Sequence, residues 1–299
     1  MRRLWAVGAA TGPLAALGFL VAVGLLVAVG LLAAACGGGG TPASVALLRD
    51  APKTTTDART SRMEIVVDRA SPGGPDAALP PVTITGEADY QAHRGHMLID
   101  LSQLGLPGQP IDAVFDNATV YEKFPQDLMA VLPPGRTWVK VDLASAGRSV
   151  GLGAGVGQTQ AGDPSQTLDF LRGASGTVKR VGSEEVRGTP TIHYHAVVDL
   201  NRAAAQSPTA SEAIRSTVKL IGSSTQPVDV WLDAQGRVRR MTYAVDLSKS
   251  KASGSASGVP SVPGSVTYTL ELFDFGVPVE AVVPPPDQVV DMSALSGGH

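Results

Sequence analysis

Apolar and polar residues alternate with a period of two over much of the chain. In the first half the alternating segments are 62–68, 82–90, 96–101, 111–115, 119–123 and 137–143. Successive side chains of a strand point to opposite faces of a sheet, so this alternation predicts half-buried strands. Because turn residues separate neighbouring segments, the pattern indicates an antiparallel meander.

The second half of the chain repeats this style. Its alternating segments are 178–182, 191–199, 229–233, 238–247 and 265–275. Residues 234–237 (Ala-Gln-Gly-Arg) place a glycine between two of them, which predicts a hairpin. Residues 184–188 predict a turn, and the proline run at 284–286 is expected to end regular structure.

Three segments favour helices instead. Residues 43–57 predict a first helix, with Ser44 as its N-cap and with Pro52 interrupting or ending it. Residues 167–172 predict a short helix, and residues 207–221 place apolar side chains three and four positions apart, as an amphipathic helix does. Strands and helices in this order predict an α+β fold, either one highly curved antiparallel sheet or two similar lobes joined edge to edge.

The chain begins with the features of a signal peptide. Arg2 and Arg3 precede an uncharged apolar run at 12–35, which ends in small residues directly before Cys36. The sole cysteine at this place resembles a bacterial lipobox, which implies that residues 1–35 are removed and that Cys36 is acylated. Residues 36–42, rich in glycine, then form a flexible tether.

Two observations count against a simple lipobox assignment. A lipobox usually has leucine three residues before the cysteine, whereas this chain has Ala33 there and Leu32 one position earlier. The apolar run is also long enough to span a membrane, so an uncleaved anchor is the alternative. Both interpretations tether the domain to the cell membrane on its extracytoplasmic face.

Composition excludes several classes of function. The 24 Lys and Arg residues nearly balance the 27 Asp and Glu residues, so no broad basic field for nucleic acid is expected. A single cysteine excludes an internal disulfide framework and cysteine-rich zinc sites. Neither a βαβ pattern nor a strand followed by GxGxxG occurs, which argues against a dinucleotide fold.

Candidate chemistry is sparse. Four histidines fall into two close pairs: His93 with His96, and His193 with His195. No carboxylate accompanies them at a ligand spacing, so we expect no bound metal or other cofactor. Asp229 and Asp233 lie on one face of a predicted strand, where paired carboxylates are more often solvated. Residues 173–176 lack the spacing of a nucleophile elbow. We therefore expect that the protein is not an enzyme.

One face of the predicted sheet is strongly apolar. The side chains that share it are Met97, Ile99 and Leu101, then Met241, Tyr243, Val245 and Leu247, then Tyr268, Leu270 and Leu272. A one-sided sheet must cover this face. Two interpretations stay open: a closed core completed by the helices, or a cavity for lipid tails, which adaptable methionines suit.

Three phrases of the sequence resemble the LppX/LprAFG lipoproteins of mycobacteria. They are residues 181–194, 228–241 and 273–279, the last followed by Pro284 and Pro285. The likeness covers residues 43–292, while residues 293–299 are expected to form a disordered tail. It implies a half-barrel of the LolA/LolB kind, a strongly curved antiparallel sheet whose concave side is covered by helices and holds the acyl chains of lipids or glycolipids.

The resemblance implies a non-enzymatic lipoprotein of an actinobacterial cell envelope that carries lipid. Its partners are a lipid or glycolipid, the membrane through the acyl anchor, and an envelope transporter or sensor protein; nucleic acid is not expected. The residues predicted to line the cavity are Met97, Ile99, Leu101, Leu171, Tyr194, Ile214, Val218, Val230, Met241, Tyr243, Leu270 and Leu272. The alternative is a structural or sensory lipoprotein with a closed core that binds a protein partner. Loops 145–163 and 248–264 depart from the family and leave the cavity size open.

Overall fold

The computed structural model describes residues 42–70, 79–104, 110–123, 125, 132–142, 163–207, 210–246 and 264–292. All of them belong to one compact unit of the chain, residues 39–299. The predicted signal peptide, Cys36, most of the tether and the tail lie outside the described residues. Within the described part of the chain, no helix has the length and apolar character needed to cross a membrane.

The described strands form a single twelve-stranded sheet. Its strands are β1 (Thr60–Ala70), β2 (Leu79–Asp89), β3 (Arg94–Asp100), β4 (Ile111–Asp116), β5 (Thr119–Lys123), β6 (Trp138–Asp142), β7 (Ala174–Val186), β8 (Thr189–Asp199), β9 (Thr225–Leu232), β10 (Val238–Asp246), β11 (Ser265–Phe273) and β12 (Val289–Asp291). They are ordered β12-β6-β5-β4-β3-β2-β1-β11-β10-β9-β8-β7. The α+β class and the mainly antiparallel sheet are confirmed, and the two halves share one sheet rather than forming separate lobes.

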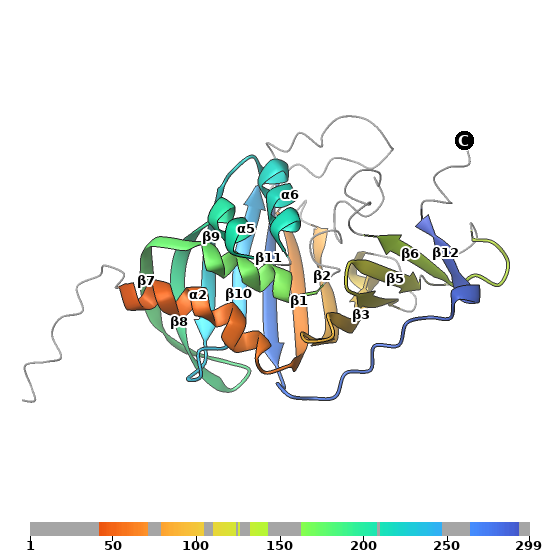
Figure 1. Cartoon of the computed structure of the whole chain (residues 1–299), viewed down its shortest axis with the longest axis horizontal. Coiled ribbons are helices and arrows are strands. Elements are labelled where there is room, and N and C mark those ends of the chain that lie inside the picture. The colour runs from red at the N-terminus through yellow and green to blue at the C-terminus, as the bar shows by residue number, and fades with distance from the viewer. Residues whose placement is uncertain are drawn as a thin grey trace, which may run out of the picture. The chain divides into compact units, whose positions relative to one another are not determined.

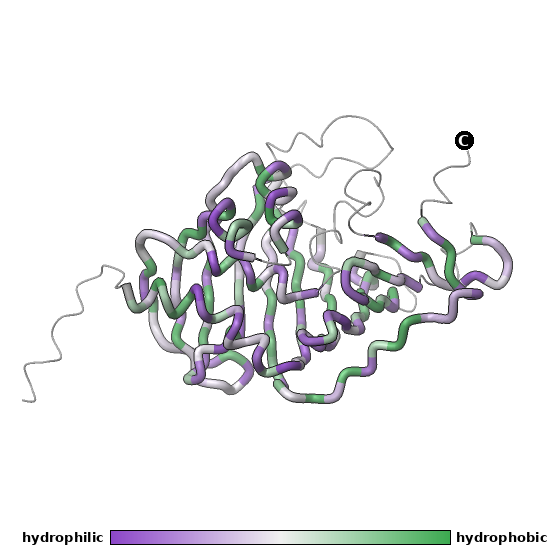
Figure 2. The backbone as a smooth tube through the Cα atoms, viewed as in Figure 1, coloured by the Kyte–Doolittle hydropathy of each residue, from purple (hydrophilic) through white to green (hydrophobic). Residues whose placement is uncertain are grey.

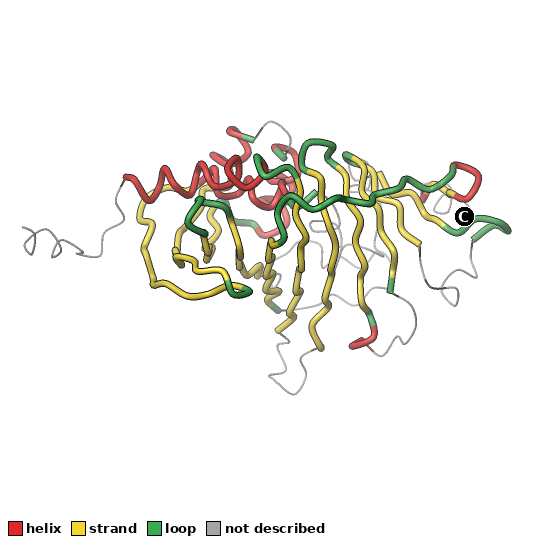
Figure 3. The backbone as a smooth tube through the Cα atoms, turned by 90° about the horizontal axis from the view of Figure 1, so that it is seen from below, coloured by secondary structure: helices red, strands yellow, loops and turns green. Residues whose placement is uncertain are grey.

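The sheet is open, because its end strands β12 and β7 do not pair with each other. Figure 3 shows the strands near β7 curling beneath the helices. At the other end β12 pairs in parallel with β6, next to the short helix η6 (Pro286–Gln288). The expectation that prolines 284–286 end regular structure is therefore wrong. Pro286 starts η6, where its missing N–H removes no bond, and the following residues add a strand.

Helices lie over one face of the sheet, in front of β7–β11 and β1 in Figure 1. They are α2 (Pro42–Thr56), α4 (Ser165–Leu168), the 3₁₀ helix η4 (Asp169–Gly173), α5 (Leu200–Gln206) and α6 (Ser211–Ile221), while a further 3₁₀ turn, η2 (Ser102–Leu104), follows β3. The predicted helices at 43–57, 167–172 and 207–221 correspond to α2, to α4 with η4, and to α6. Helix α5 continues directly from β8 and was not predicted.

Two details of α2 differ from the sequence-based expectation. The helix starts at Pro42, so Ser44 lies inside it and is not its N-cap, and Pro52 does not end it. A proline inside a helix removes one backbone hydrogen bond. The helix continues because its inner side chains Leu48, Ala51 and Thr55 are buried, and packing outweighs local propensity there.

Residues 184–188 also differ from expectation. Strand β7 extends to Val186, so Glu184 and Glu185 are strand residues, and the turn consists of Arg187 and Gly188 alone. Both have positive φ, 49° and 73°, the conformation that a two-residue type I′ hairpin turn requires. Arg187 adopts it although glycine and asparagine are the usual residues at such positions.

Burial follows the alternation of the strands. On β11, Val266, Tyr268, Leu270 and Leu272 are buried, and the residues between them are half-buried. The face that bears these four side chains also bears the helices, and we call it the helix face; the opposite face is the outer face. Figure 2 shows apolar and polar segments alternating along these strands.

Candidate functional site

The helix face carries a continuous row of apolar side chains across five strands. The pairing registers join Met241 to Leu270, Leu270 to Ile65, Ile65 to Ile84, and Ile84 to Ile99. Each of these side chains is buried within one hydrophobic cluster. The cluster extends from β7 to β5 on the sheet and takes in Leu48, Leu171 and Ile214 from the helices.

The twelve side chains predicted to line a cavity meet in this one cluster. Ten are buried, and Leu101 and Val218 are partly buried against the others. Met97, Leu171, Ile214, Val230 and Met241 are each 0% exposed, which leaves no room for a water molecule beside them. The structure therefore brings the predicted residues together in a closed arrangement, whereas their contact with a ligand stays a prediction.

Helix α6 contributes an amphipathic side to this cluster. Ile214 is fully buried, Thr217 is buried, and Val218 packs against the cluster, whereas Glu212, Arg215 and their outward neighbours are exposed. Among the described residues, the hydrogen bond from Thr217 to the carbonyl of Ala213 and the ion pair between Arg215 and Glu212 both stay within α6. Apolar packing therefore holds this helix against the layer beneath it.

Helix α2 is attached to the sheet by directional contacts. Arg49 Nε donates to the carbonyl oxygen of Ala174 at 2.7 Å, and the backbone N–H of Val238 donates to Thr55 Oγ1 at 2.9 Å. These bonds join α2 to the starts of β7 and β10. Helix α2 is thus fixed to the sheet at two defined points.

A buried polar network ties η4 to the segment before α6. Asp169 accepts hydrogen bonds from Ser207 Oγ and, at 2.6 Å, from Arg172 Nε. Ser207 Oγ in turn accepts the N–H of Ala210 at 2.9 Å, so Ser207 anchors the chain four residues before the start of α6. The N-cap of α6 itself is Ala210, and the other end turns at Gly222 in the left-handed region, with φ 66°.

Three ionisable side chains lie on or beside the apolar layer and were missed from the sequence. Tyr90 shares a hydrogen bond of 2.7 Å with Ser61, and burial raises its pKa above the ordinary value. On β5, burial raises the pKa of the Glu122 carboxyl. Arg69 on β1 is 5% exposed. For Arg69 the sequence did contain a signal. Arg69 follows Met63, Ile65 and Val67 at two-residue steps, which places its side chain on the same face of the strand as theirs.

The four candidate histidines do not meet in one site: His93 and His96 lie apart, whereas His193 and His195 share one carboxylate. His93 bonds to Asp163 at 2.9 Å and His96 to Asp112 at 2.8 Å. On the outer face, Asp229 Oδ1 bonds to His193 at 2.8 Å and to His195 at 3.1 Å. Within the ranges that the structure describes, no three His, Cys, Asp or Glu side chains are grouped so that they could hold a metal ion.

The expected pairing of Asp229 with Asp233 on one strand face is wrong. Strand β9 ends at Leu232, and the buried Asp233 turns back within the hairpin. There its carboxylate accepts the N–H groups of Gln235 and Arg237, each at 3.0 Å, and pairs with the Arg237 guanidinium at 2.8 Å. Asp233 therefore stabilises a turn.

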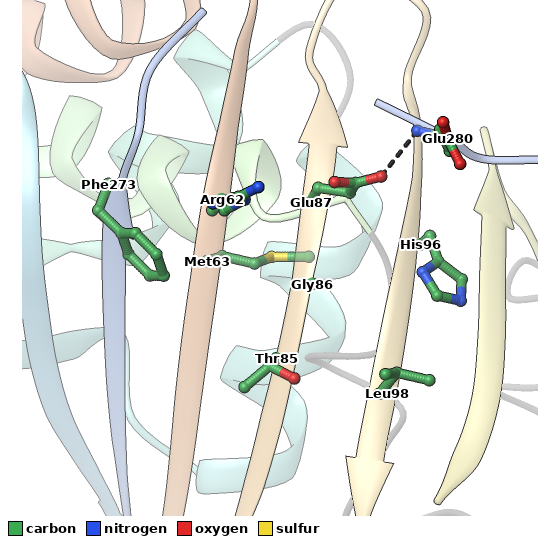
Figure 4. Close-up of a pocket in the computed structure, with 9 residues that line it drawn as sticks. All are labelled: Arg62, Met63, Thr85, Gly86, Glu87, His96, Leu98, Phe273 and Glu280. Carbon is green, nitrogen blue, oxygen red and sulfur yellow. Dashed lines mark hydrogen bonds between the residues drawn. The ribbon is translucent and has the colours of Figure 1, made fainter. Parts of the chain in front are cut away.

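The outer face bears a shallow hollow of about 360 Å³ over β1, β2 and β3. Figure 4 shows it from the side opposite to the helices, with Phe273, Thr85, His96 and Leu98 around it. At its rim Glu87 accepts a 2.7 Å hydrogen bond from the N–H of Glu280. Leu98 is 37% exposed there.

Comparison with known proteins gives partial likenesses. No family model matches the chain. An uncharacterized 31.2 kDa protein of Streptomyces griseus, encoded in the rplA-rplJ intergenic region, is 29% identical over 176 residues, which is 56% of this chain. The matched part covers 52% of that protein, so about half of its length is represented.

The chain is also similar to solved structures of mycobacterial lipoproteins. LppX of Mycobacterium tuberculosis has 14% identity and a TM-score of 0.46, over 81% of this chain and 100% of that chain. LprF of Mycobacterium bovis has 15% identity and a TM-score of 0.44, over 83% and 99%. These are lipoproteins of the kind that the sequence phrases resemble. At these identities and scores the likeness transfers neither a ligand nor an activity.

Proposed function

We propose that the protein is a non-catalytic lipoprotein, anchored through Cys36 on the extracytoplasmic face of a membrane, which binds the acyl chains of lipids between its helices and its sheet. The supporting observation is the way α6 is held. Apolar packing of Ile214 and Val218 attaches it to the cluster, and its described polar contacts are internal. Apolar contacts are not directional, so an acyl chain can replace them.

Binding then proceeds by partition. Helix α6 moves away from the sheet about the Gly222 turn on one side and the Ser207 anchor on the other. An acyl chain enters beside Met241 and Leu270 and leaves water, which contributes roughly 0.8 kcal/mol for each buried CH₂ group. Helix α2, fixed by Arg49 and Thr55, keeps its place.

Methionine suits an apolar layer that is closed when no ligand is bound and that must repack when an acyl chain enters. Met63, Met97 and Met241 are fully buried on the helix face. Their unbranched side chains have three rotatable bonds and repack at little cost. A cluster built in this way accommodates a chain of variable shape better than one built of β-branched residues.

Transfer of a fluorescent fatty acid tests this proposal. Donor vesicles hold the probe with a quencher, and the full chain is reconstituted in nanodiscs. We expect transfer to the wild-type protein above protein-free nanodiscs, and faster transfer to Ile214→Ala, which weakens the packing of α6. Lys219→Ala, on the exposed side of the same helix, is the control. Transfer equal to that of protein-free nanodiscs contradicts the proposal.

The closed cluster supports a second candidate, a lipoprotein with a permanent core that binds a protein. The outer hollow, with its exposed Leu98, is the place for such a partner. Under this alternative the protein takes up no lipid, and Ile214→Ala lowers its stability without any effect on transfer. The same experiment therefore separates the two candidates.

A further inference from the structure

Arg69 is a charged side chain on the apolar helix face. It follows Met63, Ile65 and Val67 along β1, and its backbone partner on β11 is the buried Val266. With 5% exposure it is buried, although less completely than Val67 at 0% and Val266 at 1%. A guanidinium carries its charge at any physiological pH, so this position places a permanent cation inside the layer.

The cation lacks a complete set of partners. Its Nη2 atom is buried and has no hydrogen-bond partner among the described residues. Burying a charged group without a hydrogen-bonded counterion is strongly unfavourable. Asp169, also buried, is by contrast paired with Arg172 at 2.6 Å. Buried guanidinium nitrogens without a described partner also occur at Arg94 and Arg239, but Arg69 combines such an atom with a place in line with the buried Met63, Ile65 and Val67 of β1.

The pairing of β1 with β2 is also irregular next to Arg69. Val67 pairs with Val82, but Arg69 pairs with Leu79, so β2 has one more residue than β1 between the two pairs. Pro80 and Pro81 lie in this bulge and provide no N–H groups to the ladder. Bulges bend a strand and redirect side chains, often next to binding sites. The irregularity is an observation independent of the unpaired guanidinium.

We propose that Arg69 binds the anionic headgroup, a carboxylate or a phosphate, of the amphiphile whose acyl chain enters the apolar layer. This inference rests on the proposed lipid binding and specifies the ligand class. The guanidinium offers a planar fork of N–H donors that matches both kinds of anion. A headgroup at Nη2 supplies the acceptor that the chain itself does not.

The pairing of β1 with β11 places a line of apolar side chains next to Arg69, where the acyl tail of the ligand would lie. From Arg69 the helix face leads to Val67 beside Tyr268, then to Ile65 beside Leu270, and then to Met63 beside Leu272. The six residue steps along β1 from Arg69 to Met63 span roughly 20 Å, about the length of an extended fatty acyl chain. Tyr268 stacks on Tyr243 with ring centroids 5.3 Å apart, so two aromatic rings lie next to the headgroup position.

The test compares two ligands with the same hydrocarbon tail, one with an anionic headgroup and one with a neutral headgroup. Radiolabelled oleate and radiolabelled oleyl alcohol are bound to the immobilised full chain in mild detergent, with protein-free micelles subtracted. We expect the wild type to bind oleate at least about tenfold more tightly, since hydrogen bonds between charged groups are worth that much or more. Arg69→Met is expected to bind both ligands equally, and Arg69→Lys to retain a preference for oleate.

Arg62→Met is the matched control. Arg62 lies on the same strand, points to the outer face and pairs with Asp274 at 3.1 Å, so its loss should leave the preference unchanged. Without lipid, the thermal midpoint of Arg69→Met should be equal to or above that of the wild type, because a buried unpaired charge is removed. A marked drop in that midpoint indicates a structural role for Arg69 and overturns the proposal.

The remaining outcomes separate this inference from the proposed function. Binding of neither ligand by the wild type contradicts lipid binding itself. Equal binding of both ligands, or an oleate preference that survives in Arg69→Met, overturns the headgroup site and leaves lipid binding intact. Acetate and inorganic phosphate serve as headgroups without a chain. If either anion competes as strongly as unlabelled oleate does, the site recognises the anion alone. That result overturns the proposal that an amphiphile is its ligand.

Discussion

Thr55 of α2 and Val238 of β10 are joined by a buried hydrogen bond of 2.9 Å, in which the backbone N–H of Val238 donates to Thr55 Oγ1. The same hydroxyl donates to the carbonyl oxygen of Ala51 at 2.7 Å. One hydroxyl thus accepts the first N–H of β10 and holds the last turn of α2 on the sheet. This bond distinguishes the fixed helix α2 from α6.

Replacing Thr55 by valine keeps its shape and removes this bond. The buried N–H of Val238 is then unpaired, and we expect the free energy of unfolding to fall by roughly 1–3 kcal/mol. Thr54→Val is the control, because the exposed Thr54 hydroxyl bonds only to Asp50 of its own helix. Denaturant unfolding of both variants measures the difference, and equal values for the two would mean that the bond to Val238 contributes nothing.

Met241→Trp tests whether the apolar layer is the place of lipid uptake. From the sequence alone, a preformed cavity predicts little loss of stability for this change. The 0% exposure of Met241 leads instead to overpacking, which should lower the free energy of unfolding by roughly 1–3 kcal/mol, together with reduced fatty acid uptake. Leu98→Trp on the outer face should alter neither quantity. Unchanged uptake in Met241→Trp would place the ligand elsewhere.

Glu271 on the outer face gives a pH dependence. Burial opposes its ionisation, but hydrogen bonds from Arg240 at 2.7 Å and Arg187 at 2.5 Å hold the pKa of Glu271 below its ordinary value. A carboxyl whose pKa is lower in the folded chain stabilises the fold above its unfolded pKa, roughly 4.3. That contribution is lost as the pH falls through the folded pKa.

We therefore expect Glu271→Gln to be less stable than the wild type near neutral pH, by roughly 1–3 kcal/mol, and the difference to shrink as the pH falls below about 4. Unfolding free energies measured across this pH range check the prediction. Asp57→Asn removes an exposed ion pair with Lys53 and should show almost no effect. A difference that stays constant with pH would show that ionisation of Glu271 is not responsible.

Cys36→Ala tests the anchor. The variant should carry no fatty acid, and the domain should either be released from the membrane or remain as an unprocessed precursor. Metabolic labelling with a clickable fatty acid, followed by separation of membrane and soluble fractions, measures both effects. Labelling of the alanine variant equal to that of the wild type would exclude Cys36 as the acylated residue.

The fold was largely predictable because two-residue alternation reports which face of a strand is buried. Leu270 and Leu272 show it directly, since burial of every second residue on β11 matches the sequence pattern. Helix α5 was missed because its seven residues follow β8 with no break in the chain, and a short helix held by tertiary contacts has little local signal. Strand β12 pairs with the distant β6, which no local pattern reports.

The candidate site was predictable only in its apolar part. Alternation places Met97 and Met241 on one face, but it does not tell a filled layer from an open one, because that depends on how closely the helices approach. Arg69 was overlooked although its parity places it on the helix face. Its significance lies in the absence of a described partner for Nη2, and the sequence does not show which partners a folded chain provides.

Photo-crosslinking tests the central claim most directly. A fatty acid with a photoactivatable group near the end of its chain is added to the full-length protein in nanodiscs, and the crosslinked residues are identified by tandem mass spectrometry. Binding between the helices and the sheet predicts crosslinks at Met241, Leu270 and Ile214, and none at Thr242, which lies on the outer face of the same strand as Met241. Crosslinks confined to outer-face residues, or none above a protein denatured before irradiation, would contradict it.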